Sequence, residues 1–150
     1  FNKSQIFLHF FGMGPLQVQI EKKVDEMGLR DNVLFHGHCS KSKIYSSIDI
    51  MLLPSLVEGL GMVNVEATEF GIPVCAFDVG GVGEIIQHGE SGLLSTVRDS
   101  SSMAKNVIKL VENPALVTKL VQGAQRKIKN MFDLPEKGTL LKSSIISAKV

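Results

Sequence analysis

The sequence of 150 residues is poor in cysteine, with only Cys39 and Cys75. Two thiols are too few for the disulfide framework of a small secreted domain, so a reducing compartment is expected. Long hydrophobic runs are also missing, because every apolar stretch falls far short of the roughly 18 residues that span a membrane. These absences predict a cytoplasmic protein without a signal peptide or a membrane span.

A surplus of one charge is missing as well. The 16 Lys and Arg residues nearly balance the 15 Asp and Glu residues, which leaves a net charge of +1. This balance gives no electrostatic attraction to nucleic acid, so nucleic-acid binding is not expected. With 44% apolar and 21% charged residues, and no internal repeat or low-complexity linker, the chain is expected to fold around one core.

Strand-like and helix-like segments alternate along the chain. The expected strands are residues 5–11, 33–35, 50–53, 74–77 and 93–94. The expected helices are residues 16–27, 40–47, 62–70, 82–87, 99–112 and 114–130, with Ser40 and either Asp99 or Ser100 as N-caps. Such alternation predicts an α/β fold with a doubly wound, Rossmann-like parallel sheet and ligands bound at the carboxyl ends of its strands.

The most informative segment is residues 54–67, Pro-Ser-Leu-Val-Glu-Gly-Leu-Gly-Met-Val-Asn-Val-Glu-Ala. It follows the short apolar run 50–53, which is expected to be a strand buried on both faces. Glu58 and Glu66 stand eight positions apart, with the expected turn and helix start between them. Two carboxylates in this arrangement suit a phosphate-bearing ligand whose hydroxyl groups flank its phosphates.

The turn between these carboxylates favours close approach of a ligand to the backbone. Gly59 and Gly61 allow backbone angles that are closed to other residues. The helix expected to begin at Met62 presents unpaired N–H groups and the positive end of its dipole in its first turn. Neither Leu60 nor Gly61 has a side-chain oxygen that would cap those groups, so an anion is expected to bind there.

Glu66 is expected to lie in the apolar stripe of this helix with Met62, Val63 and Phe70, because successive residues turn by about 100°. Thr68 is expected on the polar side. A carboxylate within an apolar stripe is costly unless hydrogen-bond donors satisfy it. Two interpretations stay open here: a structural glutamate satisfied by the protein itself, and a glutamate whose donors are ligand hydroxyls.

Three motifs follow one another between Pro54 and Leu94, within a longer stretch, about Gly12 to Asn130, whose features come in the order and spacing of one known family. They read Pro54-Ser55-x-x-Glu58-Gly59-x-Gly61-x-x-x-x-Glu66-Ala67-x-x-x-Gly71-x-Pro73-Val74, then Asp78-Val79-Gly80-Gly81-Val82-Gly83-Glu84-Ile85, then His88-Gly89-Glu90-Ser91-Gly92-Leu93-Leu94. Together they resemble the donor-binding signature of retaining family 4 glycosyltransferases of GT-B fold. The resemblance implies that the chain is the C-terminal, nucleotide-sugar-binding domain of such an enzyme.

The resemblance also implies a role for each site residue. Glu58 would contact hydroxyls of the transferred sugar, as the catalytic residue, and Glu66 would hold the ribose hydroxyls of the nucleotide. The other donor-binding positions that it implies are Gly59, Leu60, Gly61 and Met62 at the distal phosphate and sugar, and Gly37, His38 and Cys39 against the base.

The sequence departs from the family pattern at three places. Leu60 replaces the usual Phe, residues 68–70 replace a Met-Ala-small stretch, and Asn64 stands where an apolar residue is common. Leu60 and Asn64 are placed to reshape the sugar pocket, so they leave the identity of the donor open rather than donor binding itself.

The resemblance further implies that the chain is truncated on its N-terminal side. The domain's first strand, an Arg and Lys that clamp the donor diphosphate, and the acceptor domain would all lie upstream. Residues 1–134 are expected to form the incomplete donor-binding domain, and residues 135–150 a tail or short helix. Since the missing strand is central in such a sheet, an unpaired edge is expected on residues 5–11, on residues 50–53 or on both, unless these two strands pair with each other.

The expected function is transfer of a sugar, a hexose or a related one, from a nucleotide-diphosphate sugar to a glycan or lipid-linked glycan, with retention of configuration. Polysaccharide biosynthesis in the cytoplasm is the expected setting, with peripheral association at the inner membrane face left open. No metal or other cofactor is expected. The chain alone is expected to bind a donor feebly and to transfer nothing, because half of the cleft is absent.

Other function classes fit the residues less well. A nucleotide-sugar epimerase of the same fold and a non-catalytic nucleotide- or carbohydrate-binding module both stay open. A dinucleotide-dependent oxidoreductase is disfavoured, because Gln17 stands at the third glycine position of the motif that begins Gly12-x-Gly14. A metal site in the run 36–39, His-Gly-His-Cys, is disfavoured because no second cluster of ligands lies nearby in the sequence.

Overall fold

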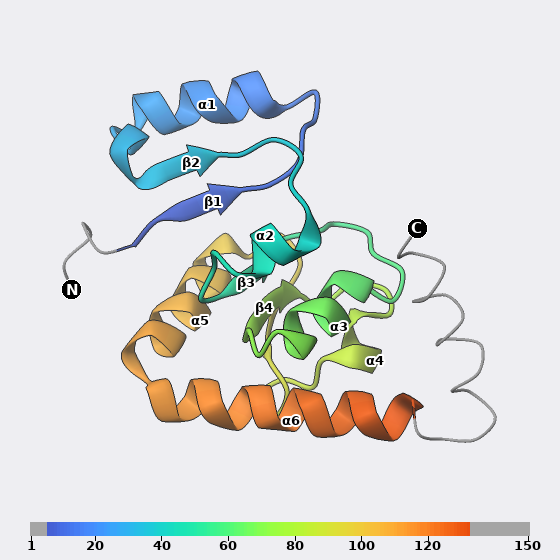
Figure 1. The fold of residues 1–150 in the computed structure, drawn as a ribbon. Coiled ribbons are helices and arrows are strands. Elements are labelled where there is room, and N and C mark those ends of the chain that lie inside the picture. The colour runs from blue at the N-terminus through green and yellow to red at the C-terminus, as the bar shows by residue number, and fades with distance from the viewer. Residues whose placement is uncertain (1–5, 133–150) are drawn as a thin grey trace. The chain divides into compact units, whose positions relative to one another are not determined.

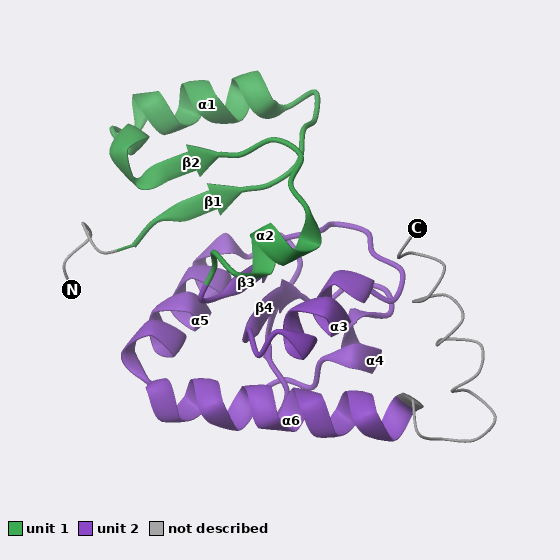
Figure 2. Ribbon diagram, viewed as in Figure 1, with its two compact units in different colours: residues 1–48 green, residues 49–150 purple. Residues whose placement is uncertain are grey.

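The computed structural model describes residues 6–132 of the chain (Figure 1). The chain divides into two compact units, residues 1–48 and residues 49–150 (Figure 2), and each unit has its own parallel sheet. The domain boundary expected at residue 134 and the tail expected at residues 135–150 lie outside the described residues. Both therefore stay predictions.

The first unit is a two-stranded parallel sheet accompanied by helices. Its elements are β1 (Leu8–Phe10), α1 (Gln17–Glu26), the 3-10 helix η2 (Arg30–Asn32), β2 (Val33–Phe35) and α2 (Lys41–Tyr45). β1 pairs with β2 so that Leu8 lies opposite Val33 and Phe10 opposite Phe35. The two phenylalanine rings stack with 5.0 Å between their centroids. As expected, Ser40 caps α2, because its side chain accepts a hydrogen bond from the N–H of Lys43.

The second unit is a three-stranded parallel sheet packed against four helices. Its elements are β3 (Met51–Leu53), α3 (Met62–Glu69), β4 (Val74–Phe77), α4 (Val82–Ile85), β5 (Leu93–Ser95), α5 (Ser100–Glu112) and α6 (Pro114–Phe132). The strand order is β3-β4-β5, so β4 is central, and all four of its residues are buried. β4 lies between α3 and α5 (Figure 1), and α6 packs against α3, α4 and α5.

The core of this second unit is formed by β4, β5 and the two long C-terminal helices. Its fully buried members are Cys75, Leu93, Leu110 and Leu120. α5 begins at the cap expected from the sequence, since the Asp99 carboxylate accepts a hydrogen bond from the N–H of Ser102 at 2.9 Å. Burial raises the pKa of the Cys75 thiol from 9.0 to about 12. This thiol is therefore a packing group rather than a reactive one.

The structure confirms the expected fold class, an α/β Rossmann-like arrangement with parallel strands. Every expected strand and every expected helix from residue 16 to residue 132 is present, with ends that move by a few residues. β1 is shorter than the expected strand 5–11, and α4 ends at Ile85 rather than at Gln87. These differences lie at element ends, where fraying and 3-10 turns blur the boundary.

The expectation that the strand at residues 50–53 is buried on both faces was wrong. Met51, Leu52 and Leu53 are each half-buried, because β3 is an edge strand that pairs with β4 alone among the described residues. β1 likewise pairs with β2 alone within the described residues. Within its own sheet, each of the two strands has one partner among the described residues. The choice between a bare edge and direct pairing of β1 with β3 stays a prediction.

Among the helices of the described residues, none combines the length and the apolar composition that crossing a membrane takes.

Candidate functional site

The loop between β3 and α3 ends at an uncapped helix N-terminus, as the sequence predicts. Gly61 has a φ of 66°, in the left-handed region, and no side chain caps the N-terminus of α3. The N–H of Asn64 donates to the carbonyl of Gly61 at 2.8 Å, which closes the first turn. The N–H groups ahead of Asn64, together with the positive end of the helix dipole, favour an anion at this place.

The loop between β4 and α4 holds this first loop in place. The N–H of Gly81 donates to the carbonyl of Gly59 at 2.8 Å. A Cβ atom on Gly80 would overlap the carbonyl oxygen of Glu58, and one on Gly81 would lie 2.7 Å from the carbonyl oxygen of Gly59. Only glycine therefore fits at both positions. In the sequence this glycine pair belongs to the second motif, and no role was predicted for it. Two adjacent glycines directly after a buried strand are a pattern that could have indicated close approach of another backbone segment.

Glu66 shares a face of α3 with Met62 and Val63, as expected, and all three are half-buried. The buried face of the helix consists of Asn64, Val65, Ala67 and Thr68, and Phe70 is 51% exposed. The polar placement of Thr68 was therefore wrong, and the expected apolar stripe is not the buried face. Packing of α3 on β4, α4 and α6 decides which face is buried, and that information is not in the helix itself.

Glu66 is half-buried rather than buried, which lowers the energetic cost of its charge. A half-buried carboxylate can keep contact with water, so the desolvation cost that motivated a ligand partner is small. Its position remains suited to a ligand, since Glu66 lies one turn into α3 on the face that also carries the half-buried Met62. Glu58 is half-buried too. Both carboxylates are thus partly accessible to solvent near the start of α3.

Exposed apolar residues flank Glu58 in the sequence of its loop. Val57 is 89% exposed, Leu56 is 53% exposed and Leu60 is 42% exposed. Gly59 is exposed and Gly61 is buried. The second unit therefore brings together six of the predicted site residues, those from Glu58 to Met62 and Glu66, on one loop and the helix that follows it.

The other three predicted site residues belong to the first unit. Gly37 has a φ of 62° and its carbonyl accepts a 2.7 Å hydrogen bond from the N–H of Gly12. Cys39 is half-buried with its thiol 3.7 Å from the carbonyl oxygen of His36, and His38 is exposed. The turn after β2 is thus joined to the turn after β1, within one unit.

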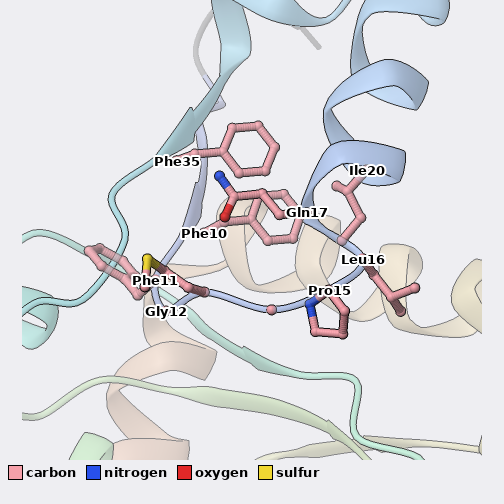
Figure 3. Close-up of a pocket in the computed structure, with 10 residues that line it drawn as sticks. Phe10, Phe11, Gly12, Pro15, Leu16, Gln17, Ile20 and Phe35 are labelled. Carbon is pink, nitrogen blue, oxygen red and sulfur yellow. The ribbon is translucent and has the colours of Figure 1, made fainter.

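A cavity of about 300 Å³ lies in the first unit beside these turns (Figure 3). In the close-up, the rings of Phe10 and Phe35 come from β1 and β2, and the side chains of Gln17 and Ile20 come from α1. Its lining residues are Phe10, Phe11, Gly12, Met13, Gly14, Pro15, Leu16, Gln17, Ile20 and Phe35. None of the predicted donor-binding residues lines this mainly apolar cavity. The cavity was therefore not predicted from the sequence.

His9 and His36 of this unit form a ring cluster with Phe11. His36 Nε2 and His9 Nδ1 are 3.0 Å apart, and both rings stack with Phe11. Within residues 6–132 no three His, Cys, Asp or Glu side chains come together as metal ligands would. That the protein needs no metal stays a prediction.

The third motif, residues 88–94, forms a structural turn ahead of β5. His88 Nδ1 accepts a 3.0 Å hydrogen bond from the N–H of Leu94, and Ser91 Oγ accepts one of 2.8 Å from the N–H of Gln87. α6 lies close to this turn, since Lys119 Nζ donates to the carbonyl of Gly89 at 3.1 Å. These hydrogen bonds explain the motif by packing.

The fold and the loop at the start of α3 define the class of the protein. Parallel strands with helices in this arrangement match the C-terminal domains of GT-B glycosyltransferases. The chain belongs to the family of glycosyl transferases group 1, whose model matches residues 2–127.

Individual relatives agree with this family. N-acetyl-alpha-D-glucosaminyl L-malate synthase of Bacillus anthracis is 33% identical over 122 residues, covering 81% of this chain and 32% of that protein. Sucrose-phosphate synthase of Thermosynechococcus elongatus is similar in structure, with a TM-score of 0.77, 26% identity and coverage of 93% of this chain and 39% of that chain. Anabaena HepE in complex with UDP-glucose has a TM-score of 0.82 at 24% identity over 95% of this chain and 41% of that chain, which shows the fold alone. The chain spans about a third of the length of the curated relatives that it matches.

Proposed function

We propose that this chain is the donor-binding part of a retaining glycosyltransferase that uses a nucleotide-diphosphate sugar. The observation that carries the proposal is the uncapped N-terminus of α3, flanked by the half-buried carboxylates Glu58 and Glu66. Such a site offers N–H groups to a diphosphate and acceptors to the hydroxyls at its two ends. Family membership supports sugar transfer as the reaction.

Each residue has a proposed role in donor binding. Glu58 contacts hydroxyls of the transferred sugar, and Glu66 holds the ribose hydroxyls. The distal phosphate is held by the backbone N–H groups of Leu60, Gly61 and Met62, and the base lies against the turn at Gly37, His38 and Cys39. The complex of HepE with UDP-glucose, a protein of the same fold, supports a nucleoside-diphosphate sugar as donor.

The proposed mechanism relies on stabilising the leaving group. The dipole and N–H groups of α3 stabilise the negative charge that develops on the departing diphosphate. The leaving phosphate then helps to remove the proton from the attacking hydroxyl on the same face of the sugar, which retains the anomeric configuration. A cationic clamp supplied by a longer protein would add to this stabilisation, and no metal is needed.

Two other functions were left open by the sequence. Family membership favours transfer over a nucleotide-sugar epimerase, because the matched family is one of transferases. A non-catalytic binding module is distinguished from a glycosyltransferase only by whether sugar transfer is detected. A glycan or lipid-linked glycan as acceptor, a cytoplasmic setting and the inactivity of the isolated chain all belong to the proposal.

The experiment that tests the proposal uses the full-length protein that carries this chain, since the chain spans about a third of its relatives. A panel of UDP-, GDP- and ADP-sugars is offered with and without simple glycan acceptors, and hydrolysis of the donor is measured as transfer to water. The expected result is turnover of at least one donor, with a product of unchanged anomeric configuration by NMR. A product of inverted configuration contradicts retention, and binding without any turnover favours the module.

A further inference from the structure

Four polar side chains are buried within the described residues: Asn64, Thr68, Ser91 and Ser95. Three of them have hydrogen-bond partners. Thr68 Oγ1 donates to the carbonyl of Asn64, Ser91 Oγ accepts from the N–H of Gln87, and Ser95 Oγ accepts from Asn106 Nδ2.

Asn64 is the exception among these four. It is 0% exposed, and within the described residues neither Nδ2 nor Oδ1 has a hydrogen-bond partner. Its backbone is satisfied, because its N–H donates to Gly61 and its carbonyl accepts from Thr68. A buried amide with no partner costs folding free energy, and an apolar residue of similar shape would avoid that cost. This cost suggests that the hydrogen-bonding groups of Asn64 have a function that an apolar side chain could not perform.

The amide of Asn64 meets the side chain of Glu58 at Gly61. A Cβ atom on Gly61 would lie 2.5 Å from Asn64 Nδ2 and 3.3 Å from Glu58 Cγ. The described residues give the Glu58 carboxylate no hydrogen bond or ion pair. The Asn64 amide is thus a hydrogen-bond donor without an acceptor, and the Glu58 carboxylate is an acceptor without a donor, within the described residues. Both side chains approach the same side of Gly61, and rotation of the Glu58 side chain would bring the two groups toward each other.

We propose that Asn64 is a positioning residue, whose Nδ2–H donates to one carboxylate oxygen of Glu58 and so aims the other oxygen at a hydroxyl of the donor sugar. This inference rests on the proposed function, in which Glu58 contacts the sugar. A hydrogen bond to a charged group is stronger than one between neutral groups, so the pair compensates the buried amide when the donor is bound. Gly61 is required in part because any side chain there would separate the two groups.

The test compares four variants of the full-length protein: Asn64→Leu, Asn64→Ala, Glu58→Gln and the double variant Asn64→Leu/Glu58→Gln. UDP and UDP-glucose serve as the first probes, followed by the donor that the wild type turns over fastest. Affinity for the nucleoside diphosphate and turnover of the donor are measured separately. Thr68→Val is the matched control, because it alters the neighbouring buried polar group of α3 without approaching Glu58.

Asn64→Leu is expected to keep nucleoside-diphosphate affinity within about twofold and to lower donor turnover about 10- to 100-fold, the size expected for loss of a charge-assisted hydrogen bond. Its melting temperature is expected to rise by about 2–6 °C, because an unpaired buried amide is removed. Asn64→Ala serves if Leu disturbs the tight packing at Gly61, and the same split between affinity and turnover is expected. The double variant is expected to lose no more turnover than Glu58→Gln alone.

Three results overturn the inference while leaving the proposed function intact. The first is an active wild type whose Asn64→Leu and Asn64→Ala variants turn the donor over at the wild-type rate. The second is a double variant whose losses add. The third is an Asn64 variant that loses nucleotide affinity and turnover in equal proportion, as general damage to the site would cause. A folded wild type that neither binds nor turns over any nucleotide-sugar overturns the proposed function and the role of Asn64 together.

Discussion

The backbone N–H of Gly81 donates a 2.8 Å hydrogen bond to the carbonyl oxygen of Gly59. This contact joins the loop after β4 to the loop after β3, which carries the candidate catalytic residue Glu58. Two neighbouring strands thus deliver their loops to the same edge of the sheet, as parallel strands do at their carboxyl ends. The shape of the Glu58 loop is consequently set by residues about twenty positions away in the sequence.

Replacing Gly80 tests this support directly. Gly80→Ala is expected to destabilise the second unit by roughly 3 kcal/mol or more, because its Cβ would overlap the Glu58 carbonyl and its φ of 52° is unfavourable for alanine. Urea denaturation gives the free energy of unfolding. The control is Gly71→Ala, which has a similar φ of 73° but no atom within 4 Å of the added Cβ. It is expected to cost about 1–2 kcal/mol, and equal losses for both variants would contradict the steric argument.

The roles of the two carboxylates are separable by binding and turnover. In the full-length protein, Glu66→Gln is expected to weaken nucleoside-diphosphate binding by about 1–3 kcal/mol, because a charge-assisted pair of hydrogen bonds to the ribose becomes a poorer match. Glu58→Ala is expected to lower turnover more than it lowers nucleotide affinity, since its contact is with the sugar. Calorimetric titration of UDP into both variants makes the comparison. If Glu58→Ala loses the nucleotide and Glu66→Gln keeps it, the assignment is reversed.

Gly123 in α6 offers a test in which helix propensity and packing predict opposite signs. Alanine in place of glycine within a helix ordinarily stabilises by roughly 0.5–1 kcal/mol. Here the new Cβ would overlap the carbonyl oxygen of Glu90, so Gly123→Ala is expected to destabilise. Thermal unfolding measures the sign. Gln122→Ala, at an exposed neighbouring position, is expected to stay within about 0.5 kcal/mol of the wild type; a Gly123→Ala variant that melts higher would show that α6 moves freely away from the turn.

The buried thiol of Cys75 predicts a loss of stability at alkaline pH. Its pKa is raised from 9.0 to about 12 in the folded protein. Between these values the unfolded chain releases the thiol proton and the folded chain keeps it, so the free energy of unfolding falls as pH rises above 9.0. The slope due to this group is about 1.4 kcal/mol per pH unit. The contribution of Cys75 is obtained by subtracting the pH dependence of the free energy of unfolding measured for a Cys75→Ala variant. If this free energy falls equally steeply with pH in both proteins, the thiol ionises in the folded state and the prediction is wrong.

Much of the fold follows from short-range signals in the sequence. Ser40 and either Asp99 or Ser100 were expected to cap helices, and Ser40 and Asp99 do so, because a cap is a contact between a side chain and an N–H three residues away. The turn at Gly61 was expected because it, too, depends on short-range features of the sequence. Its left-handed backbone and the lack of a capping oxygen depend on only a few neighbouring residues.

The errors concern burial, which depends on distant parts of the chain. Thr68 was expected on the polar side of α3 and is buried, whereas Phe70 was expected on the apolar side and is 51% exposed. Helical periodicity says which residues share a face, but the partners of that face lie on β4, α4 and α6. The residues of β3 are only half-buried for a related reason, since strand order and not composition makes it an edge.

The sequence by itself determined that this chain is an α/β domain of the glycosyl transferases group 1 family and that Glu58, Gly61 and Glu66 bracket a helix start, because motif spacing and capping act within a few turns of the chain. Only the tertiary structure decided that Gly80 and Gly81 support the Glu58 loop, and that the buried amide of Asn64 beside Gly61 has no partner within residues 6–132. Those relationships require loops and helix faces that are far apart in sequence to pack together, and packing is a property of the whole unit.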